Sequence, residues 1–224
     1  MKTIKIAFNT DEPGKIQTIA RFEELFELSY FPQLVFDNWD VEQWIRRKCA
    51  WARKRGRIKK LALWLGTLHG HQIDAADIPD VTIRWLGAEM GYGLFADSLL
   101  KKWGFIGEYT GTLRRRHLFF PNINDYCFMY PRDWLSLKAF TIDSKVQGNY
   151  TRFINHSDYP NCESVAVFHD GIYHIIFRTL QDIPAGTQLT YDYGNIYWNR
   201  RKKIEEEPIE DLIDPADLHK LKNL

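Results

Sequence analysis

Two short polar segments in the second half of the chain carry residues that could do chemistry. The sequence Arg-Phe-Ile-Asn-His-Ser at 152–157 places Asn155 and His156 directly after two apolar residues, so a buried strand or turn would present their polar groups at its end. In Leu-Thr-Tyr-Asp-Tyr, Tyr191 and Tyr193 share one face of a strand, because side chains two residues apart point the same way. Taken singly, each segment also fits an ordinary polar loop or strand end.

A glycine pair lies earlier, in the sequence Gly-Tyr-Gly-Leu-Phe-Ala that runs from Gly91 to Ala96. Glycine lets a backbone approach a bound molecule where a Cβ would clash. The same letters fit a dinucleotide-binding turn, but that alternative requires a strand, a glycine turn and a helix in repeated units. The residues that follow return to a strand pattern, which argues against a dinucleotide fold.

Metal and disulfide chemistry find little support in the sequence. The cysteines Cys49, Cys127 and Cys162 lie far apart and form no C-x-x-C pair, which argues against a structural zinc site and favours a reducing compartment. His69-Gly-His71 could be half of a metal site, but no neighbouring cysteine or carboxylate cluster completes four ligands. We therefore expect a surface turn at these histidines and no bound metal.

The elements that must position these residues fall into two regions. Up to about Gly70, apolar residues recur at helix spacing, and Asp40 is a candidate N-cap for the second helix. From Val81 the pattern changes to short strands separated by turns. Strands are expected at Val81–Leu86, Phe105–Leu113, Tyr126–Tyr130, Ala139–Asp143, Val165–Phe168, Tyr173–Phe177 and Gln188–Tyr193.

The turn Asp170-Gly171 joins two of these strands and is typical of a type I′ hairpin, whose central residues both need positive φ. With 224 residues, of which 45% are apolar, the chain is long enough for one domain and a smaller module. We expect an α+β fold with an N-terminal helical module at 1–80, a strand-rich domain at 81–198 and a charged tail at 199–224, part of which is helical or loose.

The formal net charge is only +1, so any surface for polyanions must be local. A dense basic run consists of Arg46, Arg47, Lys48, Arg53, Lys54, Arg55, Arg57, Lys59 and Lys60. We favour the solvated face of amphipathic helices, with Trp44, Trp51 and Ile58 inside, over a surface for nucleic acid, nuclear import or an acidic partner. The opening residues lack the apolar run of a signal peptide, and no stretch is long enough to span a membrane.

Taken in order, the polar segments resemble the SET-domain protein lysine methyltransferases, over roughly Val81 to Trp198. The likeness rests on Gly91 and Gly93, Tyr109 and Gly111, Arg152–Ser157, Pro160-Asn161 and Leu189–Tyr193. The likeness is greatest to the small bacterial SET proteins of the chlamydial type. With that group, the resemblance extends through the N-terminal module and covers nearly the whole chain. That closer likeness is carried by Leu63–His69, Gly107–Arg116 and Tyr197-Trp198.

The resemblance implies several short sheets, with a knot-like crossing between the Asn-His-Ser segment and the Leu-Thr-Tyr-Asp-Tyr strand. It implies S-adenosylmethionine as the cofactor and methyl donor. The cofactor-binding residues that it implies are Gly91, Tyr92, Gly93, Tyr109, Arg152, Asn155, His156 and Trp198.

For the chemistry, the resemblance implies Tyr193 at the catalytic position and Tyr191 at a Phe/Tyr switch position. A tyrosine there favours monomethylation, with dimethylation as the next product. Tyr126 and Phe128 would line the lysine channel together with these two tyrosines, although a half-buried strand explains each of them alone as well.

The resemblance also implies a basic protein substrate, such as a histone or a bacterial histone-like protein, and indirect association with chromatin. It favours a homodimer and a bacterial cytoplasmic protein that is exported into a host cell and its nucleus, with no membrane partner. Two alternatives stay open: a catalytically inactive SET-like module that binds basic tails or nucleoprotein, and a methyltransferase for a non-histone protein. The tail has no cysteine for the zinc module that closes the channel in many relatives.

Overall fold

The computed structural model describes residues 2–9, 12–116, 124–131 and 139–198. The chain divides into two compact units, Met1–Asp192 and Tyr193–Leu224. The first unit contains the helices α1 (Ile19–Phe26), α2 (Trp39–Lys54) and α3 (Lys60–Ala75) and a 3₁₀ turn, Tyr150–Phe153. The second contains α4 (Asn195–Trp198), and the expected tail after it lies outside the described residues. None of the helices in the described ranges is long and apolar enough to cross a membrane.

Among the described residues of the first unit, fifteen short strands form five small sheets, which confirms the α+β fold. They are β1 (Thr3–Ala7), β2 (Lys15–Thr18), β3 (Ser29–Tyr30), β4 (Val35–Phe36), β5 (Val81–Gly87), β6 (Gly91–Ala96), β7 (Phe105–Glu108), β8 (Thr112–Arg115), β9 (Cys127–Met129), β10 (Phe140–Asp143), β11 (Gln147–Gly148), β12 (Asn155–His156), β13 (Cys162–His169), β14 (Ile172–Thr179) and β15 (Thr190–Tyr191). Their orders are β2-β1-β5-β6, β4-β8-β10-β9, β11-β3, β12-β15 and β13-β14-β7.

The N-terminal region is not the purely helical module expected for residues 1–80. In the part of this region that the structure describes, four strands accompany the three helices, and three of these strands pair in parallel with later ones: β1 with β5, β3 with β11 and β4 with β8. The expected domain bounds at residues 80 and 198 stay predictions. Strands of two to five residues are too short to produce a periodicity, and their partners are distant in sequence.

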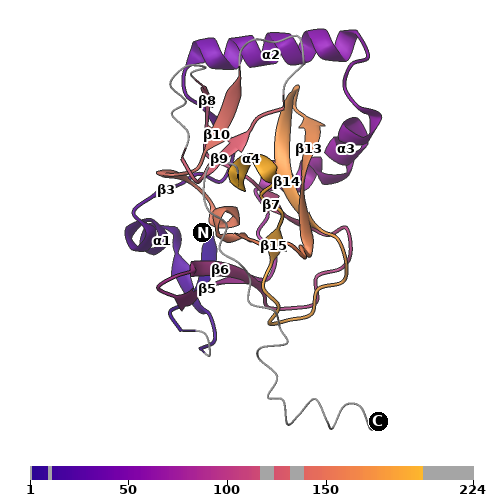
Figure 1. Cartoon of the computed structure of the whole chain (residues 1–224). Coiled ribbons are helices and arrows are strands. Elements are labelled where there is room, and N and C mark those ends of the chain that lie inside the picture. Colours follow the sequence, from indigo (N-terminus) through magenta and orange to yellow (C-terminus); the bar gives the residue numbers. More distant parts are fainter. Residues whose placement is uncertain (1, 10–11, 117–123, 132–138, 199–224) are drawn as a thin grey trace, which may run out of the picture. The chain divides into compact units, whose positions relative to one another are not determined.

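The helices cover the sheets from two sides. In Figure 1, α2 lies across the ends of β8, β10 and the β13–β14 hairpin, and α3 runs beside β13. The second helix begins at Trp39 rather than after the expected cap Asp40, because the Asn38 side chain accepts a hydrogen bond from the Val41 amide at 3.0 Å. Its buried face consists of Val41, Ile45 and Cys49, which recur every four residues.

Two expectations for side chains in the helical region are wrong. His69 does not lie in a surface turn: it is 4% exposed within α3, and its Nδ1 lies 2.8 Å from Gln72 Oε1. Trp44 and Ile58 pack inward as expected, but Trp51 is 38% exposed. Within the described ranges, no group of three His, Cys, Asp or Glu residues is arranged to hold a metal ion.

The strand-rich region follows the sequence pattern more closely. Asp170 and Gly171 have φ of 44° and 78°, so both adopt the positive values that the expected hairpin turn between β13 and β14 needs. The stretch expected as one strand at Phe105–Leu113 is two, because β7 pairs with β14 whereas β8 pairs with β10 in a different sheet. The chain thus changes sheets at this point.

Candidate active site

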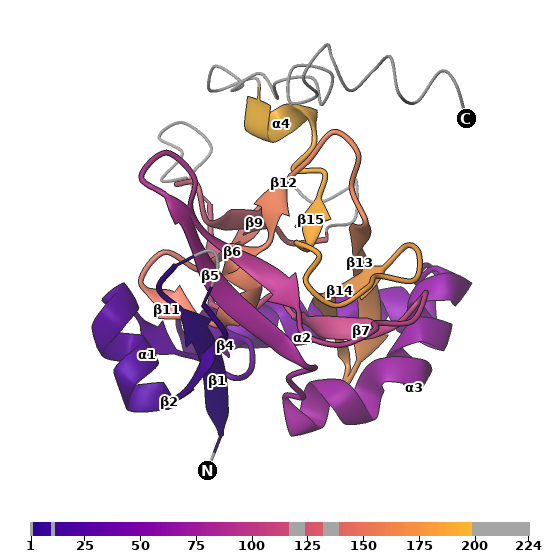
Figure 2. The ribbon, with the colours of Figure 1, turned by 90° about the horizontal axis from the view of Figure 1, so that it is seen from below.

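The two polar segments that the sequence singled out lie side by side. Strand β12 pairs in parallel with β15, with Asn155 opposite Thr190 and His156 opposite Tyr191. Figure 2 shows the two strands side by side. The Ser157 amide extends the ladder by donating to the Tyr191 carbonyl at 3.3 Å. Segments more than thirty residues apart in the chain are thereby held in one register, as the expected crossing requires.

The glycine-containing strand β6 joins the same place. Asn155 Nδ2 donates to the Tyr92 carbonyl at 3.2 Å, and the Leu189 amide donates to the Leu94 carbonyl at 2.7 Å. A Cβ built on Gly93 would lie 2.7 Å from Gln188 Nε2 and 3.3 Å from Asn155 Nδ2. Only glycine allows β6 this close to both segments, so the three strands form one site.

A single side chain, Asn161, joins the loop after β12 to the start of β15 and the residues just before it. Its Nδ2 donates to the Gln188 carbonyl at 2.7 Å, and its Oδ1 accepts from the Thr190 amide at 2.9 Å. The neighbouring Cys162 thiol also donates to this oxygen at 3.1 Å, and burial raises the pKa of Cys162 to about 12. This thiol is therefore protonated near neutral pH and acts as part of the packing rather than as a nucleophile.

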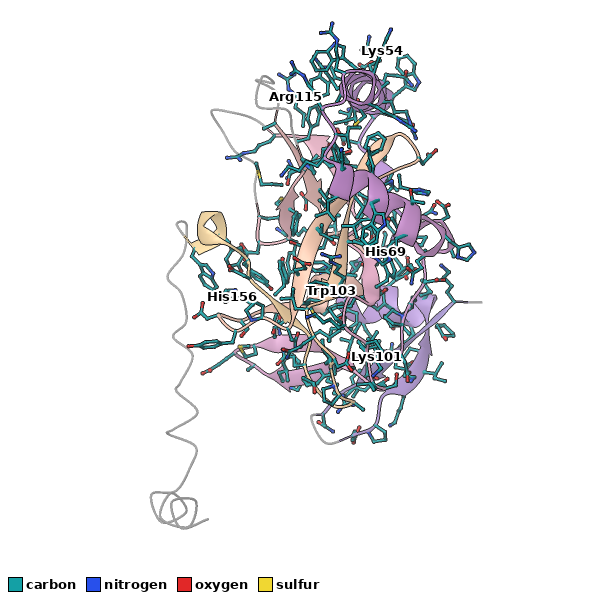
Figure 3. The ribbon with its side chains drawn as sticks, turned by 90° about the vertical axis from the view of Figure 1, so that its right-hand side faces the viewer. Lys54, His69, Lys101, Trp103, Arg115 and His156 are labelled. Atoms are coloured by element: carbon teal, nitrogen blue, oxygen red, sulfur yellow. The ribbon has the colours of Figure 1, made fainter. Side chains whose placement is uncertain are left out.

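His156 is flanked by two carboxylates. Its Nε2 lies 3.3 Å from Asp158 Oδ1 and its Nδ1 lies 3.8 Å from Asp192 Oδ1. The imidazole lies on the side of this unit away from His69 of α3 (Figure 3). Its side chain is 10% exposed, so the ring is mostly shielded while its backbone takes part in the β12–β15 ladder.

Beside the crossing, four aromatic rings pack into one group formed by Tyr109, Phe128, Phe177 and Tyr191. The ring centroids of Phe177 and Tyr191 are 4.7 Å apart, and those of Tyr109 and Phe128 are 5.3 Å apart. The Phe128 and Tyr191 rings are nearly parallel at 6.4 Å. The Tyr109 hydroxyl donates to the Tyr126 carbonyl at 2.7 Å and anchors the end of β9. This group is a rigid apolar wall next to β15.

Comparison with protein families identifies the segment that holds these residues. The SET domain model matches residues 91–194, which run from the glycine of β6 through the crossing and past β15. The chain contains a SET domain.

The curated relatives with similar SET domains are large proteins. The histone-lysine N-methyltransferase EZH2 of Chaetomium thermophilum is 31% identical over 126 residues, which is 52% of this chain and 8% of the relative. The H3 lysine-36 specific histone-lysine N-methyltransferase of Mus musculus is 36% identical over 122 residues, which is 52% of this chain and 5% of the relative. The chain thus matches less than a tenth of each relative.

Solved structures also match part of the chain. The crystal structure of KRYPTONITE in complex with mCHH DNA, H3(1-15) peptide and SAH has a TM-score of 0.43 and 27% identity. It covers 51% of this chain and 23% of that one.

The alternative of a dinucleotide-binding turn is excluded by the local structure, because Gly91–Ala96 is a strand rather than a turn before a helix.

The remaining residues expected at the cofactor site of the SET domain lie around these strands. Tyr92 packs its ring against Phe26 and Trp85, with centroids 5.0 and 4.9 Å away. The Arg152 guanidinium lies 3.8 Å from the centroid of the Tyr126 ring and donates to the Lys145 carbonyl at 3.0 Å. Their roles toward a ligand stay predictions. Tyr109, expected at the cofactor, lies in the aromatic wall together with Phe128, which was expected to line the lysine channel.

Two expected site residues, Tyr193 and Trp198, belong to the second compact unit and contact each other and Tyr197 there. The Tyr193 ring lies 4.5 Å from the Tyr197 ring, edge to face, and 6.4 Å from the Trp198 ring, nearly parallel. Tyr197 and Trp198 are 4.9 Å apart. Aromatic rings at such distances stabilise one another, so the trio forms a small cluster around α4. The meeting of Tyr193 with Asn155 stays a prediction.

Sequence reasoning missed three residues of the SET domain site. Asn161 was noted in the motif but given no role, and only its partners across the crossing reveal one. Gln188 was read as an ordinary strand residue, whereas its Nε2 is buried beside Gly93 without a hydrogen-bond partner among the described residues. Phe177 has the alternating spacing of any core residue in a strand, so no feature of the sequence indicated a place beside the site.

Proposed function

We propose that this chain transfers a methyl group from S-adenosylmethionine to a lysine side chain of another protein. The observation that carries the proposal is the pairing of β12 with β15 against Gly93, within the segment that matches the SET domain. The curated relatives that share this segment are named as histone-lysine N-methyltransferases, which supports the same reaction class here.

The residues at the crossing fit a cofactor of this kind. Gly91 has a φ of 68° and nothing within 4 Å of the place where a Cβ would stand, so the backbone there is open to a ligand. Gln188 Nε2 lacks a hydrogen-bond acceptor in the described structure, and an acceptor on a ligand would satisfy it. Asn155 and the His156 backbone would hold the ligand from the other side. S-adenosylmethionine supplies an electrophilic methyl on a positively charged sulfur.

The aromatic wall suits the lysine side of the reaction. A free lysine amine has a pKa of about 10.4, and an apolar environment disfavours its ammonium form, so the bound amine is neutral more often. Its nitrogen forms a bond to the methyl carbon while the carbon–sulfur bond breaks, and the extra proton on the nitrogen leaves to water. No dedicated base is needed, and alignment alone can supply on the order of 7–11 kcal/mol.

Two tyrosines are assigned roles in this proposal. The Tyr193 hydroxyl orients the amine and accepts weak C–H···O contacts from the methyl group, each worth about 0.5–1 kcal/mol. Tyr191 lies in the aromatic wall, where its hydroxyl can hold a water in the space that an already methylated amine would need. The expected products are therefore mainly the monomethylated and less often the dimethylated lysine.

The substrate that we propose is a histone or a histone-like basic protein, in line with the names of the relatives. A non-histone substrate is the second candidate within the same chemistry. An inactive module that binds basic tails is the candidate from another class, and the presence of Tyr193 together with Asn155 and His156 favours the enzyme over it. We further propose that the chain forms a homodimer and that it is delivered from a bacterium into the nucleus of a host cell.

The test is transfer of labelled methyl groups from S-adenosylmethionine onto histones, bacterial histone-like proteins and whole lysate, with Tyr193→Phe as the control. We expect label on lysine of a basic protein and a rate lowered about 10- to 100-fold by the substitution, because a few weak contacts and the orientation of the amine are lost. Absence of label on every protein, with S-adenosylmethionine bound, would favour the inactive module. Label that is indifferent to the substitution would remove Tyr193 from its role.

A further inference from the structure

The second half of α2, the loop at 55–59 and the first half of α3 form an exposed corner, which we call the α2–α3 corner. Nine of the chain's 30 Lys and Arg residues lie between Gln43 and Gln72, a stretch without a single Asp or Glu although the whole chain contains 29. Eight of the nine are exposed, and the ninth, Arg46, pairs with Glu42 and Asp170. The corner therefore concentrates positive charge that the rest of the chain offsets.

Large apolar side chains are exposed within the same corner. Trp51, Leu61 and Trp64 are 38%, 53% and 58% exposed. Arg55 and Arg57 hold their guanidinium groups 5.5 and 4.7 Å from the centre of the Trp51 ring, which brings the loop over α2. Trp64 follows Leu61 by three residues, so the two side chains are neighbours on the exposed side of α3 and flank the buried Leu65.

An ordinary solvated helix face does not have this composition. Such faces usually alternate Glu with Lys at i,i+4 spacing, because like charges at that spacing destabilise a helix. Here α3 begins at Lys59 and Lys60 with no acidic residue in its first turn, although the positive end of the helix dipole disfavours cations there. Exposed tryptophan adds the cost of hydrating a large apolar ring. A bound polyanion with flat apolar groups would offset both the unfavourable placement of the cations and the exposure of the tryptophan rings.

Three kinds of occupant could meet these demands. A second copy of the chain packed corner to corner would bring two basic surfaces together, and like charges facing each other oppose association. An acidic protein is a poor match, because protein interfaces are depleted in lysine, and four of the nine cations are lysines. Nucleic-acid interfaces are much more positively charged than protein interfaces, and tryptophan rings stack on bases.

We propose that the α2–α3 corner binds a single-stranded nucleic acid, with its phosphates on the arginines and lysines and unpaired bases on Trp51 and Trp64. The second half of the 16-residue helix α2 is about 12 Å long, and the loop and the first half of α3 extend the surface, which leaves room for several consecutive phosphates. The surface is separate from the β6, β12 and β15 site and does not depend on methyl transfer. Its residues lie on α2, α3 and their loop, none of which contributes to that site.

The chain offers a matched control surface around Trp103, which is 47% exposed. Lys102 Nζ and the Arg178 guanidinium lie 4.9 and 4.6 Å from the centre of this ring, so a tryptophan again stands between two cations. Here, however, Lys101 pairs with Asp182 at 2.9 Å and Arg178 with Glu163 at 2.7 Å, so the charge is balanced. Lys54 and Trp103 lie apart in Figure 3.

The experiment measures fluorescence anisotropy of a labelled single-stranded oligonucleotide and of its duplex over a salt series from about 50 to 200 mM. The variants are the double change Lys54→Ala with Arg55→Ala, the single change Trp64→Ala, and the control double change Lys101→Ala with Lys102→Ala. Thermal unfolding checks that each variant is folded.

We expect the wild type to bind the single strand more tightly than the duplex, with affinity falling steeply as salt rises. The corner double variant should bind at least tenfold more weakly with a salt slope smaller by about two, one for each lost phosphate contact. Trp64→Ala should weaken the single strand selectively, because stacking contributes little to a duplex. The control should match the wild type within about twofold.

The proposal is overturned if the wild type shows no salt-dependent binding, if the corner and control variants behave alike, or if the duplex binds as tightly as the single strand. Competition with poly-glutamate tests the remaining alternative, which is an acidic protein partner. If poly-glutamate displaces the oligonucleotide at equal charge concentration, the surface takes acidic protein instead and the assignment to nucleic acid is wrong.

Discussion

At Gly93 the site has no room for a methyl group, since a Cβ would be 2.7 Å from Gln188 Nε2 and 2.8 Å from Leu86 Cδ1. The sequence indicated a role for this glycine but not its close neighbours. These are Leu86, Asn155 and Gln188, which come from three separate parts of the chain. Asn155 shows the same limit: the motif identified it, and the structure adds the carbonyl of Tyr92 that orients its amide.

Tyr191 offers a residue-scale test of product specificity. We predict that Tyr191→Phe raises the methylation state, shifting product from monomethyl-lysine toward the di- and trimethylated forms, because the water held by the hydroxyl is lost while ring packing against Phe177 remains. Mass spectrometry of the modified lysine measures this. Phe128→Leu serves as a control that alters the wall without removing a hydroxyl, and an unchanged product distribution in Tyr191→Phe would refute the switch.

At the scale of elements, the crossing is held by very few groups, since β12 and β15 have two residues each. Asn161→Ala removes two hydrogen bonds that join the loop to the segment before β15 and leaves the Thr190 amide and the Gln188 carbonyl unsatisfied. We predict a loss of about 2–4 kcal/mol in the free energy of unfolding. Urea denaturation measures it.

The change Asn161→Asp keeps the acceptor for Thr190 but places a carboxylate oxygen against the Gln188 carbonyl in place of the donating Nδ2, so a loss at least as large as that of Asn161→Ala is expected near neutral pH. If Asn161→Ala changes the free energy of unfolding by less than about 0.5 kcal/mol, the side chain does not hold the crossing together.

The sheet β4-β8-β10-β9 contains a pH-dependent contact. Burial raises the pKa of Asp143, but hydrogen bonds from Asn124 and Arg114 outweigh it and hold that pKa below its ordinary value. A carboxyl with a lowered folded pKa adds stability above its unfolded pKa of about 3.9 and loses it as pH falls through the folded value.

We therefore predict that Asp143→Asn lowers the free energy of unfolding by about 1–3 kcal/mol near neutral pH, and that the difference from wild type shrinks below about pH 4. Urea titrations across pH measure both effects. A difference that persists unchanged at the lowest pH would show that the charge of Asp143 contributes nothing.

Elements whose signal is local were predictable, and those defined by distant partners were not. The Asp170-Gly171 turn and β5 were expected from their own residues, and the structure confirms them. The start of α2 was misplaced because Asn38 and Asp40 are both good caps, and only the bond to the Val41 amide decides between them. Strands β1, β3 and β4 were missed because they exist by pairing with residues far along the chain, and β2, whose partner is β1, has only four residues.

At the scale of the molecule, a net charge of +1 conceals an uneven distribution. The acid-free stretch from Gln43 to Gln72 forms one strongly basic surface, while the crossing lies in other elements of the same compact unit. Composition alone could exclude a general polyanion binder but could not show the exposure of Trp51, which came from the fold. The proposed methyl transfer and the proposed nucleic-acid binding use different residues, so substitutions at the α2–α3 corner should leave methylation of a free peptide intact.

The most direct measurement is a calorimetric titration of S-adenosylmethionine into the wild type and two amide variants. Each variant removes a side-chain amide that donates a hydrogen bond to a backbone carbonyl. Asn155→Ala removes the bond to Tyr92 at the crossing, which is 3.2 Å long, and the control Gln33→Ala removes the bond to Asp74 of α3, which is 3.0 Å long. One-to-one binding by the wild type and Gln33→Ala, and a Kd raised at least about tenfold in Asn155→Ala, is the predicted result. Absence of binding by the wild type, or equal affinity in all three proteins, would contradict the assignment of the crossing as the cofactor site.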